Sequence, residues 1–264
     1  MLAHEQQARR AIEVLGFHAE HGASGVFAAR FAAMSSELTS DELAGIHRNA
    51  WFATLDASDR RALLEEGELR EFRAGEYLFH RGDPADGIFG VASGTLKASR
   101  LGANGSEAIL SLVGRGSWFG EVSSIDRLPR SHDVCVLTPT RMLHAREETI
   151  ERLLLRPGFA RSLAALQCAH TRGIFELMED AHLRSTRARI ARRIEYLARG
   201  DGVLSDSPRR VVSVTQDTLA MMLGLTRQTL SMELRAIAST GAISLSYGHI
   251  AIESLDKLRL VDGV

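Results

Sequence analysis

Four polar side chains near the C-terminus have types and spacing that suit them to directional hydrogen bonds with a partner molecule. They recur at helical spacing on one face of a predicted helix and are Arg227, Gln228, Ser231 and Arg235. Arginine and glutamine make paired hydrogen bonds to the edges of guanine and adenine in the major groove. The pattern therefore predicts a recognition helix that presents its N-terminal half to base edges.

The elements around this face follow the order of a helix–turn–helix with a wing. Thr215 and Thr226 each precede an apolar-periodic segment, where a hydroxyl caps the first N–H groups of a helix. Gly224 lies between the two segments, at a turn that requires positive φ. Residues 242–245 and 249–252 predict a hairpin, the wing. We favour a winged helix–turn–helix over an ordinary helical hairpin with a solvated face.

A second segment carries the residue types of an anion site. Residues 116–134 read GSWFGEVSSIDRLPRSHDV, and a short helix is predicted to start near Gly120. Glycine exposes backbone N–H groups at that helix N-terminus, which favours anions. Arg130 adds a forked cation that matches a phosphate, and Ser131 adds a hydroxyl. The alternative is that Arg130 and Glu121 pair with each other as a structural ion pair.

Charge is distributed unevenly along the 264 residues. The formal net charge is −1, but residues 184–264 hold 12 Lys or Arg and 8 Asp or Glu, a net of +4, against −5 for residues 1–183. A basic C-terminal part on an acidic body suits a protein that contacts phosphate with one end. A weakly polarised surface is the plainer interpretation.

The sequence argues against several classes of function. Cys135 and Cys168 are the only cysteines and cannot supply a four-thiolate cluster, so we expect no metal site. We find no catalytic triad order and no phosphate-binding loop followed by Lys-Ser/Thr, so we expect no catalytic residues and no enzyme activity. No apolar run reaches membrane-spanning length and no signal peptide is recognisable, so the expected location is the cytoplasm, without membrane contact.

The middle of the chain predicts a β-structure between helices. Residues 41–66 predict helix, and residues 67–120 then hold 11 of the 23 glycines. Short strands with regular turns indicate an antiparallel barrel or roll. Residues 1–36 match neither part, and we expect a flexible arm or a mis-assigned start. The predicted strands are Tyr77–His80, Ile88–Val91, Thr95–Arg100, Ala108–Val113, Val134–Leu137 and Arg141–His144.

A long helix is predicted from about Phe159 to His182, after a short helix over residues 147–155. Its apolar residues recur close to every 3.5 positions and form one stripe along the helix: Phe159, Leu163, Leu166, Ile174 and Leu177. His170 and Gly173 lie on the same stripe. Such a stripe needs a partner helix. We expect this stripe to be the interface of a homodimer, because a twofold-symmetric dimer can bind two DNA half-sites at once. The alternative is a helix packed on its own barrel. Ser185 is predicted to cap the next helix.

The order of roll, long helix and winged helix–turn–helix resembles the Crp/Fnr family of bacterial transcription regulators. Two motifs carry the resemblance, which covers residues 41 to about 260. They are TQDTLAMMLGLTRQTLSMELRAI with its wing, and the 116–134 segment, which is similar to the phosphate-binding cassette of cyclic-nucleotide domains. The resemblance implies an α+β fold with a cyclic-nucleotide-binding-like β-roll over residues 37–158, a dimerisation helix over 159–183 and a winged helix–turn–helix over 184–264.

The resemblance also implies an effector site. The matching positions are Gly120, Glu121, Arg130 and Ser131. By this resemblance Arg130 holds a phosphate and Glu121 accepts hydrogen bonds from a ribose hydroxyl. The implied effector is cyclic AMP or another cyclic nucleotide.

Some positions depart from the family pattern. His132 stands where cyclic-nucleotide binders usually have a small residue, and Ile174 and Phe175 stand where the best-known member has a threonine–serine pair that reaches the adenine. An empty or differently liganded pocket is therefore as well supported as cyclic AMP. A haem-sensing member would need an axial ligand, for which the candidates are His80, His144 and His170.

The base-reading positions mix family-like and unusual residues. Arg227 matches the family arginine that takes a guanine edge, a contact worth about 1–3 kcal/mol of discrimination. Gln228 stands where glutamate is usual and Met232 where arginine often sits, so we expect a half-site unlike that of the well-known members. The expected base contacts are Arg227, Gln228, Ser231 and Met232, and the expected phosphate contacts are Thr215, Thr226 and Thr229.

The sequence therefore leaves three functions open. The leading one is an effector-gated homodimeric transcription regulator whose partners are double-stranded DNA, a second copy of the chain and RNA polymerase. The second is a regulator of the same fold with an empty pocket. The third is a cyclic-nucleotide-binding module whose winged part docks a protein.

Overall fold

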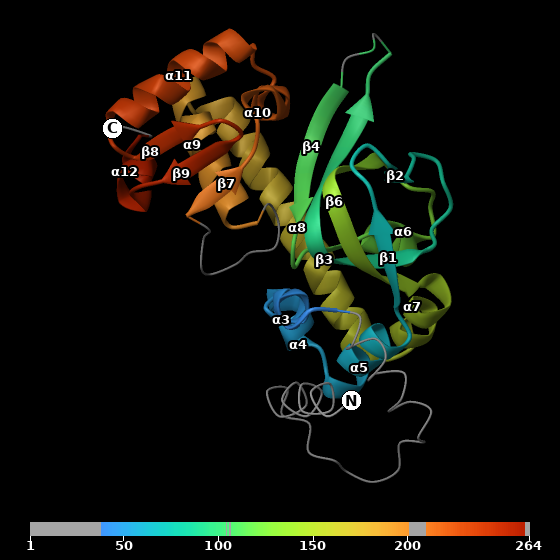
Figure 1. The fold of residues 1–264 in the computed structure, drawn as a ribbon. Coiled ribbons are helices and arrows are strands. Elements are labelled where there is room, and N and C mark those ends of the chain that lie inside the picture. The colour runs from blue at the N-terminus through green and yellow to red at the C-terminus, as the bar shows by residue number, and fades with distance from the viewer. Residues whose placement is uncertain (1–37, 104, 106, 201–209, 262–264) are drawn as a thin grey trace.

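The long helix α8 (Pro157–Leu183) connects a β-roll to a smaller winged part, as Figure 1 shows. The computed structural model describes residues 38–200, apart from 104 and 106, and residues 210–261. The arm expected over residues 1–36 lies outside the described residues, as does most of the loop that precedes the winged sheet.

Three short helices occupy the segment that the sequence predicts as helical, residues 41–66. They are α3 (Ser40–His47), α4 (Ala50–Thr54) and α5 (Ala57–Glu65). Thr39 caps α3 in a reciprocal capping box with Glu42, and Asn49 caps α4 by accepting a hydrogen bond from the Phe52 N–H. Asn49 has extended backbone. Extended residues at these caps divide the predicted helical segment into three helices, so its helical character is confirmed and the breaks are added by the structure.

Within the described residues, the roll is a six-stranded sheet in which all the pairs are antiparallel. Its strands are β1 (Glu68–Phe72), β2 (Tyr77–Phe79), β3 (Gly87–Leu101), β4 (Glu107–Gly114), β5 (Trp118–Phe119) and β6 (Asp133–Arg146). The antiparallel roll is confirmed. The expectation of only short strands is wrong, because β3 and β6 each contain two of the predicted runs.

Bends explain why two long strands resemble four short ones in the sequence. The register of β3 against β6 shifts three times between Val91 and Leu96. Gly94 lies within this stretch at φ 92° and approaches the Thr140 side chain of β6. An irregular pair bends the strand and breaks the two-residue alternation of side chains. The interrupted apolar pattern therefore marks a bend and not a strand end.

An aromatic core joins the first helices to the roll and to α8. Phe52 of α4 stacks on Trp118 of β5, with ring centroids 5.2 Å apart and planes 7° apart. Trp51 meets Trp118 edge-on at 5.5 Å and donates its indole N–H to the Ser162 carbonyl of α8. Phe159 of α8 is buried in the same cluster. These contacts fix the N-terminal half of α8 against the roll, next to α7 (Glu147–Leu154).

The stripe predicted as a homodimer seam is therefore largely internal. Phe159, Leu163 and Leu166 are buried within the chain, and Gly173 faces the Tyr196 hydroxyl. A 3.5-residue stripe drifts around a helix that has 3.6 residues per turn, so its two halves face different neighbours. The first half of α8 packs on its own roll, which is the alternative interpretation. The large apolar side chains of α8 that are exposed are Ile174, Phe175, Met178 and Leu183.

The winged part has the elements that the sequence predicts, with a short helix added at the end. They are α9 (Thr186–Ala198), β7 (Val211–Ser213), α10 (Gln216–Leu223), α11 (Arg227–Ser239), β8 (Ile243–Ser246), β9 (His249–Ile252) and α12 (Leu255–Leu260). Ser185, Thr215 and Thr226 cap α9, α10 and α11 through their hydroxyls, as predicted. The strands pair in the order β7-β9-β8. Among the described residues, no helix combines the length and hydropathy needed to cross a bilayer.

Gly87 is the backbone position at which a side chain is least tolerable. Its φ is 127°, and an added Cβ would lie 2.0 Å from the Ala145 carbonyl oxygen. Gly82 has a similar φ of 94° but open space around it. We expect Gly82→Ala to lower the free energy of unfolding by about 1–3 kcal/mol through backbone strain. Gly87→Ala should cost clearly more in the same chemical denaturation series, because backbone must also move. Equal losses would contradict this packing.

Candidate effector cavity and nucleic-acid interface

A cavity of about 600 Å³ lies where the roll meets α6 (Glu121–Asp126), α8 and α9. Its volume falls within the range of about 300–1,000 Å³ typical of small-ligand pockets. Most of its wall is apolar and includes Trp51, Leu110, Val113, Trp118, Leu166 and Leu177. The polar side chains that line it include Glu121, Arg130, Ser131, His132 and His170. The cavity therefore brings together all four predicted effector-binding residues, because Gly120 lines it as well.

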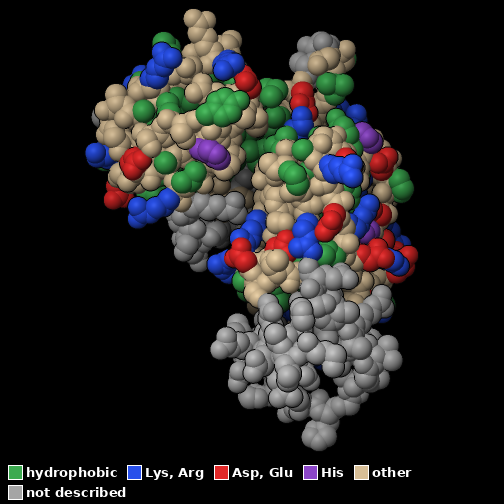
Figure 2. All heavy atoms as spheres, in the orientation of Figure 1, with side chains coloured by type: hydrophobic (Ala, Val, Ile, Leu, Met, Phe, Trp, Pro, Cys, Tyr) green, Lys and Arg blue, Asp and Glu red, His purple; other side chains and the backbone are tan. Residues whose placement is uncertain are grey.

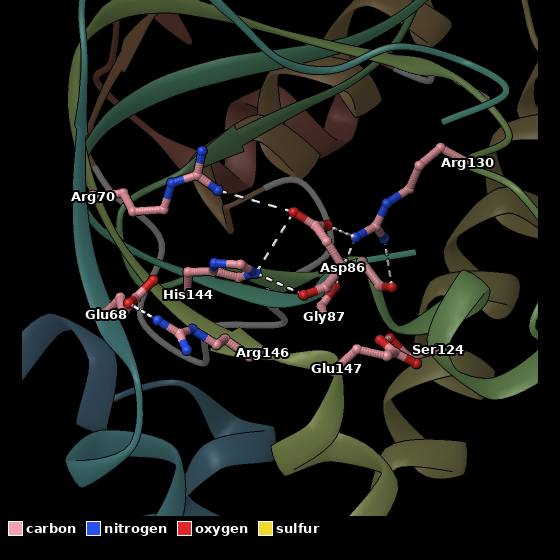
Figure 3. A network of polar contacts seen from close by, with 10 residues as sticks. Glu68, Arg70, Asp86, Gly87, Ser124, Arg130, His144, Arg146 and Glu147 are labelled. Carbon is pink, nitrogen blue, oxygen red and sulfur yellow. Dashed lines mark hydrogen bonds and ion pairs between the residues drawn. The ribbon is translucent and has the colours of Figure 1, made fainter. Parts of the chain in front are cut away.

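Arg130 is buried, and its guanidinium hydrogen-bonds to three neighbouring groups, as Figure 3 shows. Its Nη2 donates to Asp86 Oδ1 at 2.6 Å and to the Gly87 carbonyl at 2.8 Å, and its Nη1 donates to the Gly120 carbonyl at 2.9 Å. The guanidinium also lies over the Phe79 ring, 4.5 Å from the centroid. A buried cation requires such partners. The predicted alternative of an Arg130–Glu121 pair is wrong, because Asp86 takes the place of Glu121.

Asp86 is the acidic centre of this network. Its carboxylate also lies 3.9 Å from Arg70 Nη1 and 3.7 Å from His144 Nε2, and its carbonyl accepts a hydrogen bond from His144 at 2.8 Å. His144 in turn stacks on Phe89 at 4.5 Å. Burial lowers the pKa of His144, while the Asp86 carbonyl and carboxylate raise it less. Sequence reasoning missed Asp86, because its partner Arg130 lies 44 residues further along the chain.

Glu121 is 2% exposed and faces α8. His170 Nδ1 lies 2.7 Å from Glu121 Oε1, in a hydrogen bond that the carboxylate accepts. Burial lowers the pKa of His170, but the hydrogen bond and the charge of Glu121 outweigh it, so the pKa is raised overall. The carboxylate expected to meet a ribose hydroxyl is thus already engaged by the long helix.

The unusual residues of the cassette and of α8 do not all reach the cavity. His132 lines it, and its ring meets Phe79 edge-on at 6.1 Å. Burial, followed by the charge of Arg130, lowers the pKa of His132. Ser131 is exposed and hydrogen-bonds the His132 ring at 2.9 Å. Ile174 lines the cavity, whereas Phe175 is 62% exposed.

The candidate axial histidines are dispersed. His170 lines the cavity, His144 lies in the Asp86 network, and His80 lies 3.4 Å from Asp133. In the part of the chain that the structure describes, no group of three or more His, Cys, Asp or Glu is arranged to hold a metal ion.

The predicted base-reading face of α11 is exposed. The side chain of Arg227 is 70% exposed and lies 3.4 Å from Asp217. The opposite face of α11 is buried through Leu230, Leu234 and Ile237. Figure 2 shows basic side chains on the surface over α11. One shallow surface hollow is lined by Arg227, Gln228, Ser231, Met232 and Arg235.

The three threonines expected at phosphates lie at the N-termini of the two reader helices. The hydroxyl of Thr215 accepts from the Thr218 N–H, and that of Thr226 accepts from the Thr229 N–H. Thr215 and Thr226 are exposed and Thr229 is half-buried. Helix N-termini and their hydroxyls are common phosphate donors, so the positions suit a DNA backbone.

Strand β4 borders both the cavity and the winged part. Ile109 and Leu112 are buried in the same apolar cluster as α9, α10 and α11. Leu110, Ser111 and Val113 line the cavity. The register of β3 against β4 shifts beside Leu110, since Ser99 pairs with Ile109 and Ala98 with Ser111. The bulge lets one short strand present side chains to two compartments.

Comparison with known proteins gives the same arrangement of parts. A cyclic nucleotide-binding domain model matches residues 69–156, and a Crp-like helix-turn-helix domain model matches residues 188–261. The chain is similar to the CRP-like cAMP-activated global transcriptional regulator of Mycobacterium tuberculosis, with 25% identity over 78% of this chain and 93% of that protein. It is also similar to the cyclic AMP receptor protein of Thermus thermophilus, with 29% identity over 73% of this chain and 87% of that protein.

A solved structure supports the fold independently. FixK2 of Bradyrhizobium japonicum superposes with a TM-score of 0.66 at 17% identity, over 75% of this chain and 98% of FixK2. Both domain models match in the expected order, and the relatives align over most of their lengths. The chain belongs to the Crp/Fnr family of transcription regulators.

Proposed function

We propose that this regulator binds DNA as a homodimer and that a small anionic effector in the cavity controls the binding. The observation that carries the effector part is the position of β4, which lines the cavity with Leu110 and Val113 and packs into the winged core with Ile109 and Leu112. A ligand that moves β4 must change the packing of the DNA reader, because close-packed interfaces do not deform continuously.

The division of labour follows the expected domains. Residues 37–158 form the effector-sensing roll, 159–183 the dimerisation helix and 184–264 the DNA reader. Transcriptional control of this kind acts through RNA polymerase at a promoter, and we expect it in the cytoplasm, where the bacterial chromosome lies.

In the proposed DNA complex, α11 enters the major groove by its exposed face. Arg227 takes a guanine edge and Gln228 an adenine edge, because these pairings satisfy two hydrogen bonds each. Ser231 and Met232 border the same hollow and contact the neighbouring bases. Thr215, Thr226 and Thr229 hold the phosphates and set the register of the helix in the groove.

The exposed apolar residues of α8 supply the dimer contact. Ile174, Phe175 and Met178 form an apolar patch on a long helix whose other half is fixed to the roll. Two such helices that pair about a twofold axis bury both patches and bring two readers to half-sites about 34 Å apart.

The proposed effector is cyclic AMP or another cyclic nucleotide. The relatives from Mycobacterium tuberculosis and Thermus thermophilus are named for cyclic AMP. In this chain, Arg130 would meet the phosphate, together with Ser131 and the backbone at Gly120, and Glu121 would meet the ribose. Three of the five guanidinium N–H groups of Arg130 donate to Asp86, Gly87 and Gly120, and its Nε lacks a hydrogen-bond partner among the described residues.

A ligand-independent regulator is the second candidate. The observation that favours it is that Asp86 already neutralises Arg130, and His170 already engages Glu121. A cavity whose charged groups are satisfied within the protein does not require an effector for stability.

The first prediction concerns base recognition. Arg227→Ala should weaken binding to a site selected from random DNA by about 1–3 kcal/mol and relax the preference at one base pair, because a bidentate contact is lost. Electrophoretic mobility shifts give the affinity. The matched control is Arg161→Ala, an exposed arginine of α8 far along the chain from the reader. Unchanged affinity and preference in Arg227→Ala would contradict the assignment, and binding that is insensitive to salt would favour a protein-docking role.

The second prediction concerns assembly. Phe175→Glu places a charge in the proposed seam and should convert the dimer to a monomer at micromolar concentration, as measured by sedimentation velocity. Leu155→Glu is the control, since Leu155 is an apolar residue that is 84% exposed and lies outside α8. A Phe175→Glu protein that sediments like the wild type would rule out this seam.

The third prediction concerns the effector. Titration calorimetry should detect binding of cyclic AMP or cyclic di-GMP to the wild type. Arg130→Lys should weaken it at least tenfold, because lysine keeps the charge but loses the planar fork. Arg127→Lys, at an arginine whose side chain is 79% exposed, should bind like the wild type. The absence of heat and of any thermal shift with both nucleotides would select the ligand-independent regulator.

A further inference from the structure

The Glu121–His170 hydrogen bond is a direct polar contact between the cassette helix α6 and the long helix α8 inside the cavity. The two residues are 49 positions apart in the chain, and their atoms lie 2.7 Å apart. The Glu121 side chain is 3% exposed and the His170 side chain 25%. A buried carboxylate needs a partner that supplies hydrogen bonds or positive charge, and the structure supplies one from α8.

The other charged or titratable groups that line this cavity do not replace that partner. Arg130 is turned to Asp86 and to the carbonyls of Gly87 and Gly120. His132 hydrogen-bonds Ser131, and burial lowers its pKa, which favours a neutral ring. On the side of α9, Tyr196 lines the cavity, with its hydroxyl close to Gly173. His170 is thus the histidine of the cavity that is suited to carry a positive charge.

We propose that protonated His170 is a latch on Glu121, and that an effector hydroxyl must open this latch to reach the carboxylate. The inference rests on the proposed effector site and adds its regulation. When the latch opens, the hydroxyl donates to Glu121, and the imidazolium gives its proton to solvent. The polar tie between α6 and α8 is then lost. Effector binding would in this way change the contacts of the dimerisation helix α8 as well as those of β4.

The latch has a defined dependence on pH. The folded-state pKa of His170 is raised from its ordinary value of 6.5. The ion pair is therefore fully formed below 6.5 and is lost as the pH rises through the raised value. Since binding releases one proton, affinity for a hydroxyl-bearing effector should rise with pH by up to tenfold per unit until the latch is deprotonated. His170→Gln keeps a hydrogen-bond donor without a titrating charge, so this dependence should vanish.

The first arm of the test needs no effector. Nuclear magnetic resonance titration of the histidine ring signals in the full chain should show His170 titrating above 6.5. In Glu121→Gln the titration should fall below that value, because burial is then opposed by no charge. His182→Gln, at an exposed histidine of the same helix, serves as the control and should leave the His170 titration unchanged. A His170 that titrates at or below 6.5 in the wild type would overturn the latch.

The second arm uses cyclic AMP and its 2′-deoxy analogue as probes, with calorimetry at pH 6, 7 and 8. We expect affinity for cyclic AMP to rise with pH in the wild type and in His182→Gln, and to be flat in His170→Gln. The analogue should show no rise in any of the three proteins, because it has no 2′-hydroxyl to compete for Glu121. The same pH dependence in His170→Gln as in the wild type would overturn the proposal.

The two arms separate the latch from the effector assignment. If neither nucleotide binds any variant, the cyclic-nucleotide proposal fails, and the histidine titration by itself decides for or against the latch. If cyclic AMP binds His170→Gln but not the wild type at pH 6, both proposals are supported.

Discussion

The burial of one guanidinium organises the sensing part of this regulator. Arg130 comes from the segment before β6, yet its hydrogen bonds reach Asp86 and Gly87 at the start of β3 and Gly120 at the entry to α6. A charge in this position is tolerable only when its partners are fixed. The hydrogen bonds of Arg130 therefore hold together the segment before β6, the start of β3 and the entry to α6, and they shape the polar end of the cavity.

Much of the apolar wall of the cavity comes from other elements, among them α4, β5 and α8. Trp118 and Phe52 stack across the junction of β5 and α4, and the adjoining core holds the first half of α8. With one half of α8 fixed, the other half extends past the roll toward α9 and the winged part (Figure 1). The exposed apolar patch on that second half is thus a consequence of packing, because a single helix cannot bury every side of itself against one roll.

Two structural routes lead from the cavity to the DNA reader. One is β4, whose bulge at Leu110 gives it a face in each compartment. The other is α8, which carries His170 in the cavity and continues to the turn before α9. Both routes consist of packed or hydrogen-bonded contacts, and interfaces of that kind tend to shift between discrete arrangements, which is the property that a switch requires.

The sequence by itself determined the features that depend on neighbours within about four residues. The capping threonines at 215 and 226, the left-handed Gly224 between their helices and the polar face from Arg227 onward are local, so a helix–turn–helix could be inferred before any coordinates. The cassette around Gly120 was recognisable because its residues form one contiguous motif, 116–134, similar to that of cyclic-nucleotide domains. Tertiary structure decided the rest. The partner of Arg130 is 44 residues away and that of Glu121 is 49 residues away, and no local pattern encodes which of several acids or histidines comes close. Packing also explains why four predicted strands are two bent ones. It likewise explains why the first half of the predicted dimer stripe on α8 is buried against the roll. Spacing along the chain specifies the face of a helix, but only packing specifies what that face meets.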